Sequence, residues 1–175
     1  MSDLRYPIGQ LKLPVSITEE HLKSGIETLK TFPDQLKTET LSLDQKQLDT
    51  PYRAGGWTIR QVIHHVSESH MNGFIRFKWA LTEDIPIIKA YHEDRWALFS
   101  DDVSMPVKIG LSLIEALHQK WVYLLESFTE TEWNKSYFHP EDDNRYQLRE
   151  SLLVYQWHSK HHLAHITMLK ERNRW

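Results

Sequence analysis

Histidine is the residue type with the clearest chemical potential in this sequence. The chain has eleven histidines, and four of them lie between Trp157 and His165. Two pairs there are four residues apart, His158/His162 and His161/His165, and such residues share one face of a helix. Two imidazoles at this spacing supply part of a zinc-type site, which often combines three histidines with one open position. The pattern predicts a divalent-metal site.

The two pairs differ in their position relative to the apolar stripe of the last predicted helix. At about 100° per residue, His162 falls within this stripe and His158 lies at its edge. His161 is expected to face solvent, and His165 to face a flank or an interface. The spacing therefore favours His158 and His162 as ligands.

A third ligand must come from another element, and the second long predicted helix carries three candidates. His65 lies beside a polar edge stripe, whereas His64 lies nearly opposite the apolar face. His70 is nearer the centre of the apolar stripe. Periodicity leaves His65 and His70 both open.

Other residues have simpler interpretations. His118 lies at the edge of an apolar helix face, so we expect a core histidine that is hydrogen-bonded to a neighbour. His139 precedes Pro140 and is expected in a loop, where substrate contact and solvation are equally credible. Trp157 projects from the back of the last helix and should pack against a partner chain or the long connections.

The elements that must position these residues are helices. Only six glycines and seven prolines are present, and apolar residues recur at steps of three and four. A first helix is expected from an N-cap at Ser16 or Thr18, ending before Pro33, with a shorter helical piece through Leu41. These features predict a helical first segment that is interrupted by proline.

A capping box begins the second long helix. Residues 49–56 are turn-rich, and Thr58 and Gln61 then have the spacing of a capping box. An apolar stripe follows for about six turns.

Two further long helices are expected, separated by connections. One runs from about residue 106 to 128 and the other from about 146 to 172. Segment 82–102 should be a long connection with one helical turn near Trp96, and segment 131–144 is another connection. Four amphipathic helices with long connections predict an all-α four-helix bundle.

Composition bounds the class of protein. The chain has 175 residues, so a single domain over residues 1–175 is expected. Lys and Arg number 21 against 24 Asp and Glu, without a basic block, which argues against nucleic acid as a partner. The longest apolar stretch is far shorter than the roughly 20 residues of a membrane span, and no secretory signal is visible. We therefore expect a cytoplasmic protein that is not bound to a membrane.

The absence of cysteine narrows the chemistry further. It excludes protein thiol nucleophiles, iron–sulfur clusters and cysteine-containing zinc sites.

Three segments resemble the DinB-like superfamily of metal-binding four-helix bundles, within it the YfiT type. They are residues 55–66 (GGWTIRQVIHHV), residues 115–121 (EALHQKW) and residues 155–166 (YQWHSKHHLAHI). That family includes metal-dependent hydrolases and bacillithiol S-transferases. The match covers most of the chain.

The resemblance implies a particular ligand set. A histidine late in the Trp-Thr-Ile-Arg segment and two histidines four apart on the last helix bind one divalent metal in that family, which corresponds to His65, His158 and His162. The resemblance thus decides His65 over His70. It also implies Ni²⁺ or Zn²⁺ and a homodimer. Many relatives carry Gln where this chain has His165.

Two reactions follow from an open site of three histidines. Such a site lowers the pKa of bound water or stabilises a thiolate. The first reaction is hydrolysis of a small molecule, with Glu68 or Glu141 as a candidate base. The second is transfer of the bacillithiol thiol to an electrophile, which the resemblance places slightly ahead. A non-catalytic helical binding module is the third alternative.

Overall fold

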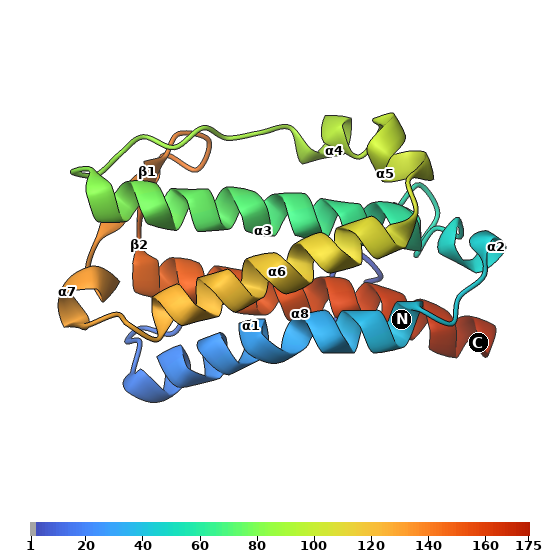
Figure 1. The fold of residues 1–175 in the computed structure, drawn as a ribbon, viewed down its shortest axis with the longest axis horizontal. Helices are drawn as coiled ribbons and strands as arrows, with labels where there is room; N and C mark the ends of the chain where they lie inside the picture. The colour runs from blue at the N-terminus through green and yellow to red at the C-terminus, as the bar shows by residue number, and fades with distance from the viewer. Residues whose placement is uncertain (1–2) are drawn as a thin grey trace.

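Four long helices form the body of the molecule (Figure 1), and the computed structural model describes residues 3–175. The long helices are α1 (Glu19–Thr40), α3 (Ile59–Thr82), α6 (Val107–Leu125) and α8 (Leu148–Asn173). The shorter elements are α2 (Gln45–Leu48), α4 (Glu93–Trp96), α5 (Ser100–Ser104), α7 (Glu130–Trp133), β1 (Ser136–His139) and β2 (Asn144–Gln147).

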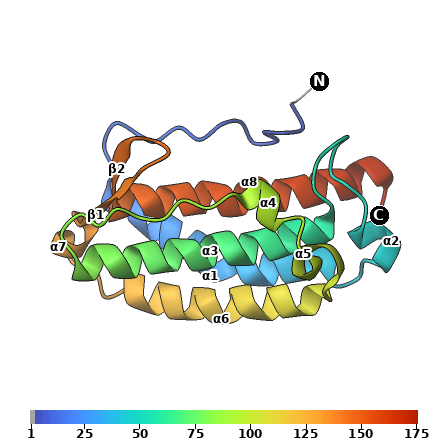
Figure 2. The ribbon, with the colours of Figure 1, turned by 90° about the horizontal axis from the view of Figure 1, so that it is seen from above.

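The four long helices close into a bundle. Helix α1 packs against α6 and α8, and α3 packs against the same two helices. Helices α3 and α6 run in the same direction, because the segment with α4 and α5 returns along the length of the bundle (Figure 2). The expected all-α four-helix bundle is confirmed, and within residues 3–175 no helix is long and apolar enough to cross a membrane.

The core divides into two apolar clusters with histidines between them. One cluster includes Phe77 and Trp121, and the other includes Ile63 and Ile114. On α3, α6 and α8 the residues of the two clusters are separated along the helix by His70, His118 and His158, respectively. Apolar packing on both sides therefore holds a layer of histidines in the middle of the bundle.

The prediction that the first helix ends before Pro33 is wrong. Helix α1 begins after the expected N-cap, Thr18, and continues through Pro33 to Thr40. Proline has no N–H, so the carbonyl of Leu29 loses its donor within the helix. The Nδ1 atom of His118 lies 2.5 Å from that carbonyl oxygen and replaces the donor. A contact from another helix thus compensates for the proline.

The connection before the last helix contains structure that periodicity did not predict. Strands β1 and β2 pair in antiparallel register, with Ser136 opposite Gln147. Helix α8 therefore begins at Leu148 rather than at Tyr146, which lies in β2.

Other boundaries also differ from expectation. Helix α6 ends at Leu125 instead of Phe128, and Pro106 is its N-cap. The turn expected near Trp96 is present as α4, whereas α5 was not predicted.

Candidate metal centre

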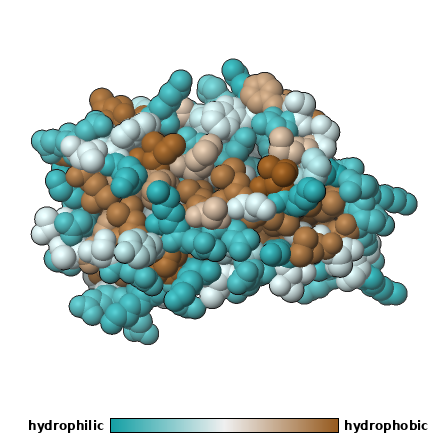
Figure 3. Space-filling model, in the orientation of Figure 1, coloured by the Kyte–Doolittle hydropathy of each residue, from teal (hydrophilic) through white to brown (hydrophobic). Residues whose placement is uncertain are grey.

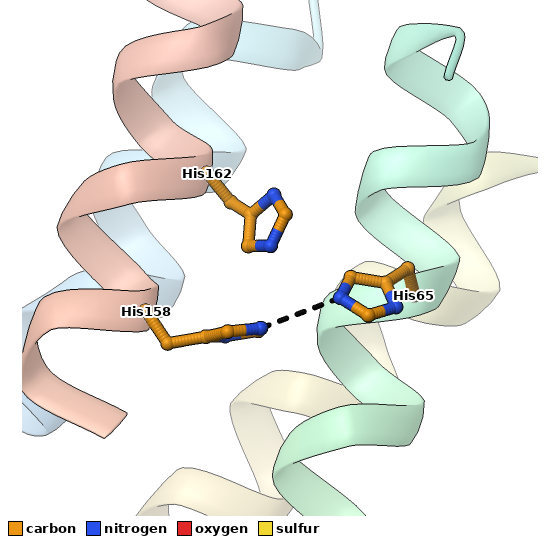
Figure 4. A group of neighbouring side chains, drawn as sticks. All are labelled: His65, His158 and His162. Carbon is orange, nitrogen blue, oxygen red and sulfur yellow. Dashed lines mark hydrogen bonds between the residues drawn. The ribbon is translucent and has the colours of Figure 1, made fainter. Parts of the chain in front are cut away.

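Three histidines from two helices converge in the bundle. His65 extends from α3, and His158 and His162 extend from α8 toward it (Figure 4). Each offers one ring nitrogen, and these nitrogens all lie within 4.8 Å of one another. The structure thus brings together the three residues that the resemblance implied.

The start of α3 is anchored close to His65. The Thr58 hydroxyl accepts from the backbone N–H of Gln61 at 3.2 Å, and the Gln61 side chain accepts from the N–H of Thr58 at 2.9 Å. Arg60 is buried and donates to Asp49 at 2.7 Å and to the carbonyl of Met105 at 3.0 Å. These bonds fix the first turns of the helix that carries His65.

The donor set fits a divalent ion. The Nε2 atoms of His65 and His158 are 3.3 Å apart. Two nitrogens that each lie about 2.0 to 2.1 Å from a tetrahedral ion are separated by about 3.3 Å. The spacing of this pair therefore suits Zn²⁺ or a similar ion, and a set of three histidines leaves a position for water or substrate.

The environment keeps these imidazoles neutral. Burial lowers the pKa of His65 to about 3, and neighbouring histidines contribute to the shift. Burial is also the largest cause that lowers the pKa of His158 and His162 well below the usual 6.5, and neighbouring histidines add to the shift. Metal ligation requires neutral imidazole, so the three side chains are in the competent form at pH 7.

A pocket of about 440 Å³ opens beside the three histidines. The Trp57 ring lies over His65, with ring centroids 4.4 Å apart, and covers one side of it. Tyr91, from the connection between α3 and α4, also lines the pocket. A small molecule can therefore enter this pocket and reach the histidines, and part of the pocket lining is aromatic.

The pocket also contains two arginines without a direct carboxylate partner among the residues that the structure describes. Arg53 and Arg76 line it, and the Nε atom of each is buried without a hydrogen-bond partner in the described part of the chain. Among residues 3–175, neither guanidinium forms an ion pair with a carboxylate. Sequence reasoning missed both arginines, because nothing in their spacing distinguishes them from surface residues.

The prediction that His161 faces solvent is wrong. Its side chain is buried and stacks on Trp157, with ring centroids 4.3 Å apart. The N-terminal segment, residues 3–18, passes over this side of α8, and the Trp157 indole donates to the carbonyl of Gly9 at 3.2 Å. Trp157 therefore packs against this segment of its own chain rather than against the long connections.

Three further histidines have clear places. His165 is buried, and its ring stacks on Tyr52 at 3.9 Å between centroids. His118 is a hydrogen-bonded core histidine, as predicted. His70 is fully buried and lies between His118 and His158 instead of in the ligand group.

The candidate bases lie in different places. Glu68 lines a separate cavity with Asp101 and Asp102, where burial raises its pKa to about 7. It does not line the histidine pocket, so the structure gives no support for Glu68 as a base there. Glu141 lines the histidine pocket, as does His139, which ends β1 and lies 3.3 Å from Asp142. Glu141 remains the candidate.

Comparisons with known proteins agree with this architecture. The family model described as the DinB superfamily matches residues 29–166. A protein of Bacillus mycoides (strain KBAB4) is 48% identical and one of Bacillus cereus (strain AH820) is 49% identical, each over the whole of both chains. Both are named putative metal-dependent hydrolase.

A solved structure shows the same fold. YfiT from Bacillus subtilis is described as a probable metal-dependent hydrolase with an unusual four-helix bundle topology. It matches with a TM-score of 0.96 and 42% identity over 98% of each chain. The chain belongs to the DinB superfamily.

Proposed function

We propose that this chain is a metal-dependent enzyme that acts on small molecules, with one divalent ion, Ni²⁺ or Zn²⁺, held by His65, His158 and His162. The observation that carries the proposal is the convergence of three imidazole nitrogens within 4.8 Å beside an open pocket. A divalent ion at such a site favours the ionised form of a water or thiol that it binds. The names of the relatives support metal dependence.

Within this class, we place transfer of a thiol from bacillithiol to an electrophile first. Arg53 and Arg76 carry positive charge in the pocket without carboxylate partners, which favours a substrate or co-substrate with an anionic group. The chain has no cysteine, so no thiol of its own competes with an external one. The Trp57 ring packs beside His65 and adds an apolar surface to the pocket.

Hydrolysis is the second candidate. Glu141 lines the pocket and can accept a proton from an attacking water. The relatives are named as hydrolases, which favours the same reaction.

Metal analysis of single variants tests the site. His65→Ala, His158→Ala and His162→Ala should each lose stoichiometric metal, because two imidazoles hold a divalent ion much more weakly than three. His161→Ala is the matched control on α8, since His161 is buried beside the site but outside the proposed set. Equal loss in all four variants would contradict the assignment.

Activity assays separate the candidate reactions. Electrophile consumption that needs both the metal and bacillithiol would support S-transfer, and it should disappear in His162→Ala. Turnover of esters or amides that ignores added thiol would support hydrolysis. A biological activity that survives His162→Ala would instead support a binding module.

The assembly and setting are also proposals. We propose a homodimer in the cytoplasm. Apolar residues form a band across the face in Figure 3, and Ile109 and Leu113 of α6 are exposed. Sedimentation analysis of purified protein measures the oligomeric state.

A further inference from the structure

A continuous line of hydrogen bonds crosses the bundle from α1 to His158. His118 Nδ1 lies 2.5 Å from the carbonyl oxygen of Leu29, and His118 Nε2 lies 2.7 Å from His70 Nδ1. His70 Nε2 then lies 3.0 Å from His158 Nδ1. His70 and His118 are 0% and 1% exposed, so water does not compete for these contacts.

The chemistry of the first atom gives the whole line a direction. A carbonyl oxygen can only accept, so the proton of neutral His118 is on Nδ1 and its Nε2 accepts. His70 must then donate from Nδ1 and accept at Nε2. His158 in turn donates from Nδ1. The Ser69 hydroxyl oxygen lies 3.5 Å from His158 Nε2, which keeps its lone pair as an acceptor. This is the nitrogen that faces His65.

Pro33 explains why the Leu29 carbonyl can accept a hydrogen bond from His118. In an unbroken helix, the N–H of residue 33 would bond to the carbonyl of residue 29. Proline has no N–H, so the Leu29 carbonyl is available to His118. The proline inside α1 and the orientation of a candidate ligand on α8 are thus connected through two imidazoles.

A shorter connection of the same kind reaches His162. His165 Nε2 lies 3.3 Å from the carbonyl oxygen of Arg5, in the N-terminal segment. By the same argument His165 accepts at Nδ1, which lies 3.4 Å from His162 Nδ1. His162 therefore donates from Nδ1 and keeps the lone pair of its Nε2.

We propose that His70, His118 and His165 are positioning residues that hold His158 and His162 in the tautomer that offers Nε2 to the metal. The inference rests on the proposed metal site. Free histidine favours the opposite tautomer, with the proton on Nε2, so an unsupported ligand must change tautomer before it binds a metal through Nε2. Partners of this kind typically change metal affinity by about 10- to 100-fold.

The tautomers are measurable without metal or activity. Nitrogen-15 spectra of the metal-free protein at neutral pH should show His158 and His162 with a protonated Nδ1 and an unprotonated Nε2. In His70→Phe, the acceptor for His158 is lost, so His158 should populate the form protonated on Nε2. Zn²⁺ affinity, measured by competition with a chromophoric chelator, should fall about 10- to 100-fold.

Two variants separate positioning from packing. His70→Gln keeps one acceptor and one donor, so it should restore the His158 tautomer and most of the affinity. His64→Phe is the matched control, because His64 is also buried on α3 but bonds to the carbonyl of Met105. Its Zn²⁺ affinity and the His158 spectrum should remain as in the parent protein, and circular dichroism verifies the fold of every variant.

Several results would overturn the proposal. In the metal-free parent protein, a proton on Nε2 of His158 would do so, as would unchanged spectra and affinity in His70→Phe. Failure of Zn²⁺ to bind at all would instead overturn the proposed metal site, while the tautomer spectra still test this inference.

The group formed by His161, His162 and His165 offers a direct alternative, since its nitrogens also lie within 4.8 Å of one another. Under the present proposal the chain binds one Zn²⁺, and His165→Gln retains it. Two bound ions, with one lost in His165→Gln, would overturn the role of His165.

Discussion

His118 shows how one side chain can serve both the fold and the candidate site. It supplies the donor that Pro33 removes from α1, and it contacts His70 on α3. Burial lowers the pKa of His118 to about 4, although its bond to the Leu29 carbonyl acts in the opposite direction. A neutral imidazole at this position is therefore part of the folded state at neutral pH.

This pKa predicts a specific pH dependence of stability. The unfolded chain binds a proton at His118 near pH 6.5, whereas the folded chain does so only near pH 4. The free energy of unfolding is thus unaffected by this group above pH 6.5 and decreases as the pH falls from 6.5 toward 4. In His118→Gln the slope should be smaller by up to about 1.4 kcal/mol per pH unit. Urea unfolding of the metal-free parent protein and variant at several pH values measures this slope. Equal slopes in the two proteins would contradict the lowered pKa of His118.

At the scale of elements, the contact between α3 and α8 depends on a glycine. The Tyr155 ring of α8 packs against the backbone at Gly73 of α3, and a Cβ there would lie 2.6 Å from the Tyr155 hydroxyl oxygen. Tyr155 is buried one turn before His158, and its ring also meets His70 edge-on at 5.2 Å between centroids. The close approach therefore helps to set the distance between the two helices that carry the candidate ligands.

Gly73→Ala should destabilise the protein. Alanine gains about 1 kcal/mol in helix propensity, but the overlap with Tyr155 should outweigh this gain and give a net loss of about 1–3 kcal/mol in the free energy of unfolding. Denaturant unfolding measures the change, with Lys78→Ala on the exposed side of α3 as control. Adding Tyr155→Leu should relieve part of the loss, because the two changes are coupled. A more stable Gly73→Ala protein would show that the helices separate easily.

At the scale of the whole molecule, the histidine layer lies between two apolar clusters that supply the core of the bundle. Residues from all four long helices form these clusters, including the fully buried Leu29, Ile63, Trp121 and Leu152. A chain of this size can bury about two-thirds of its surface on folding. The bundle should therefore be stable without metal.

Removal of metal should lower the melting temperature without unfolding the chain. A ligand that binds only the native state adds about 2.7 kcal/mol at a free concentration of 100 times its Kd, and chelation removes this term. Helical circular dichroism at room temperature should persist after chelation, while the melting temperature decreases. His162→Ala is the control, and its melting temperature should not respond to the chelator. Loss of helical signal on chelation would assign a structural role to the metal.

The sequence alone determined the features that depend on local periodicity. The four amphipathic helices, the capping box at Thr58 and the inward pair His158/His162 follow from spacing, because the apolar face of a helix is set by its own residues. Spacing left His65 and His70 open, and the resemblance chose between them. The structure places His65 beside the pair and His70 behind His158.

Only the tertiary structure decided what covers each helix face and which distant atoms meet. His161 and His165 are buried by the N-terminal segment, Glu68 faces a separate cavity, and β2 takes the residues that would have extended α8. Pro33 remains inside a helix because a histidine 85 positions later in the chain supplies the missing donor. A periodic pattern shows which side of a helix is apolar. It does not show which segments pack against that side, because this depends on how distant parts of the chain fold together.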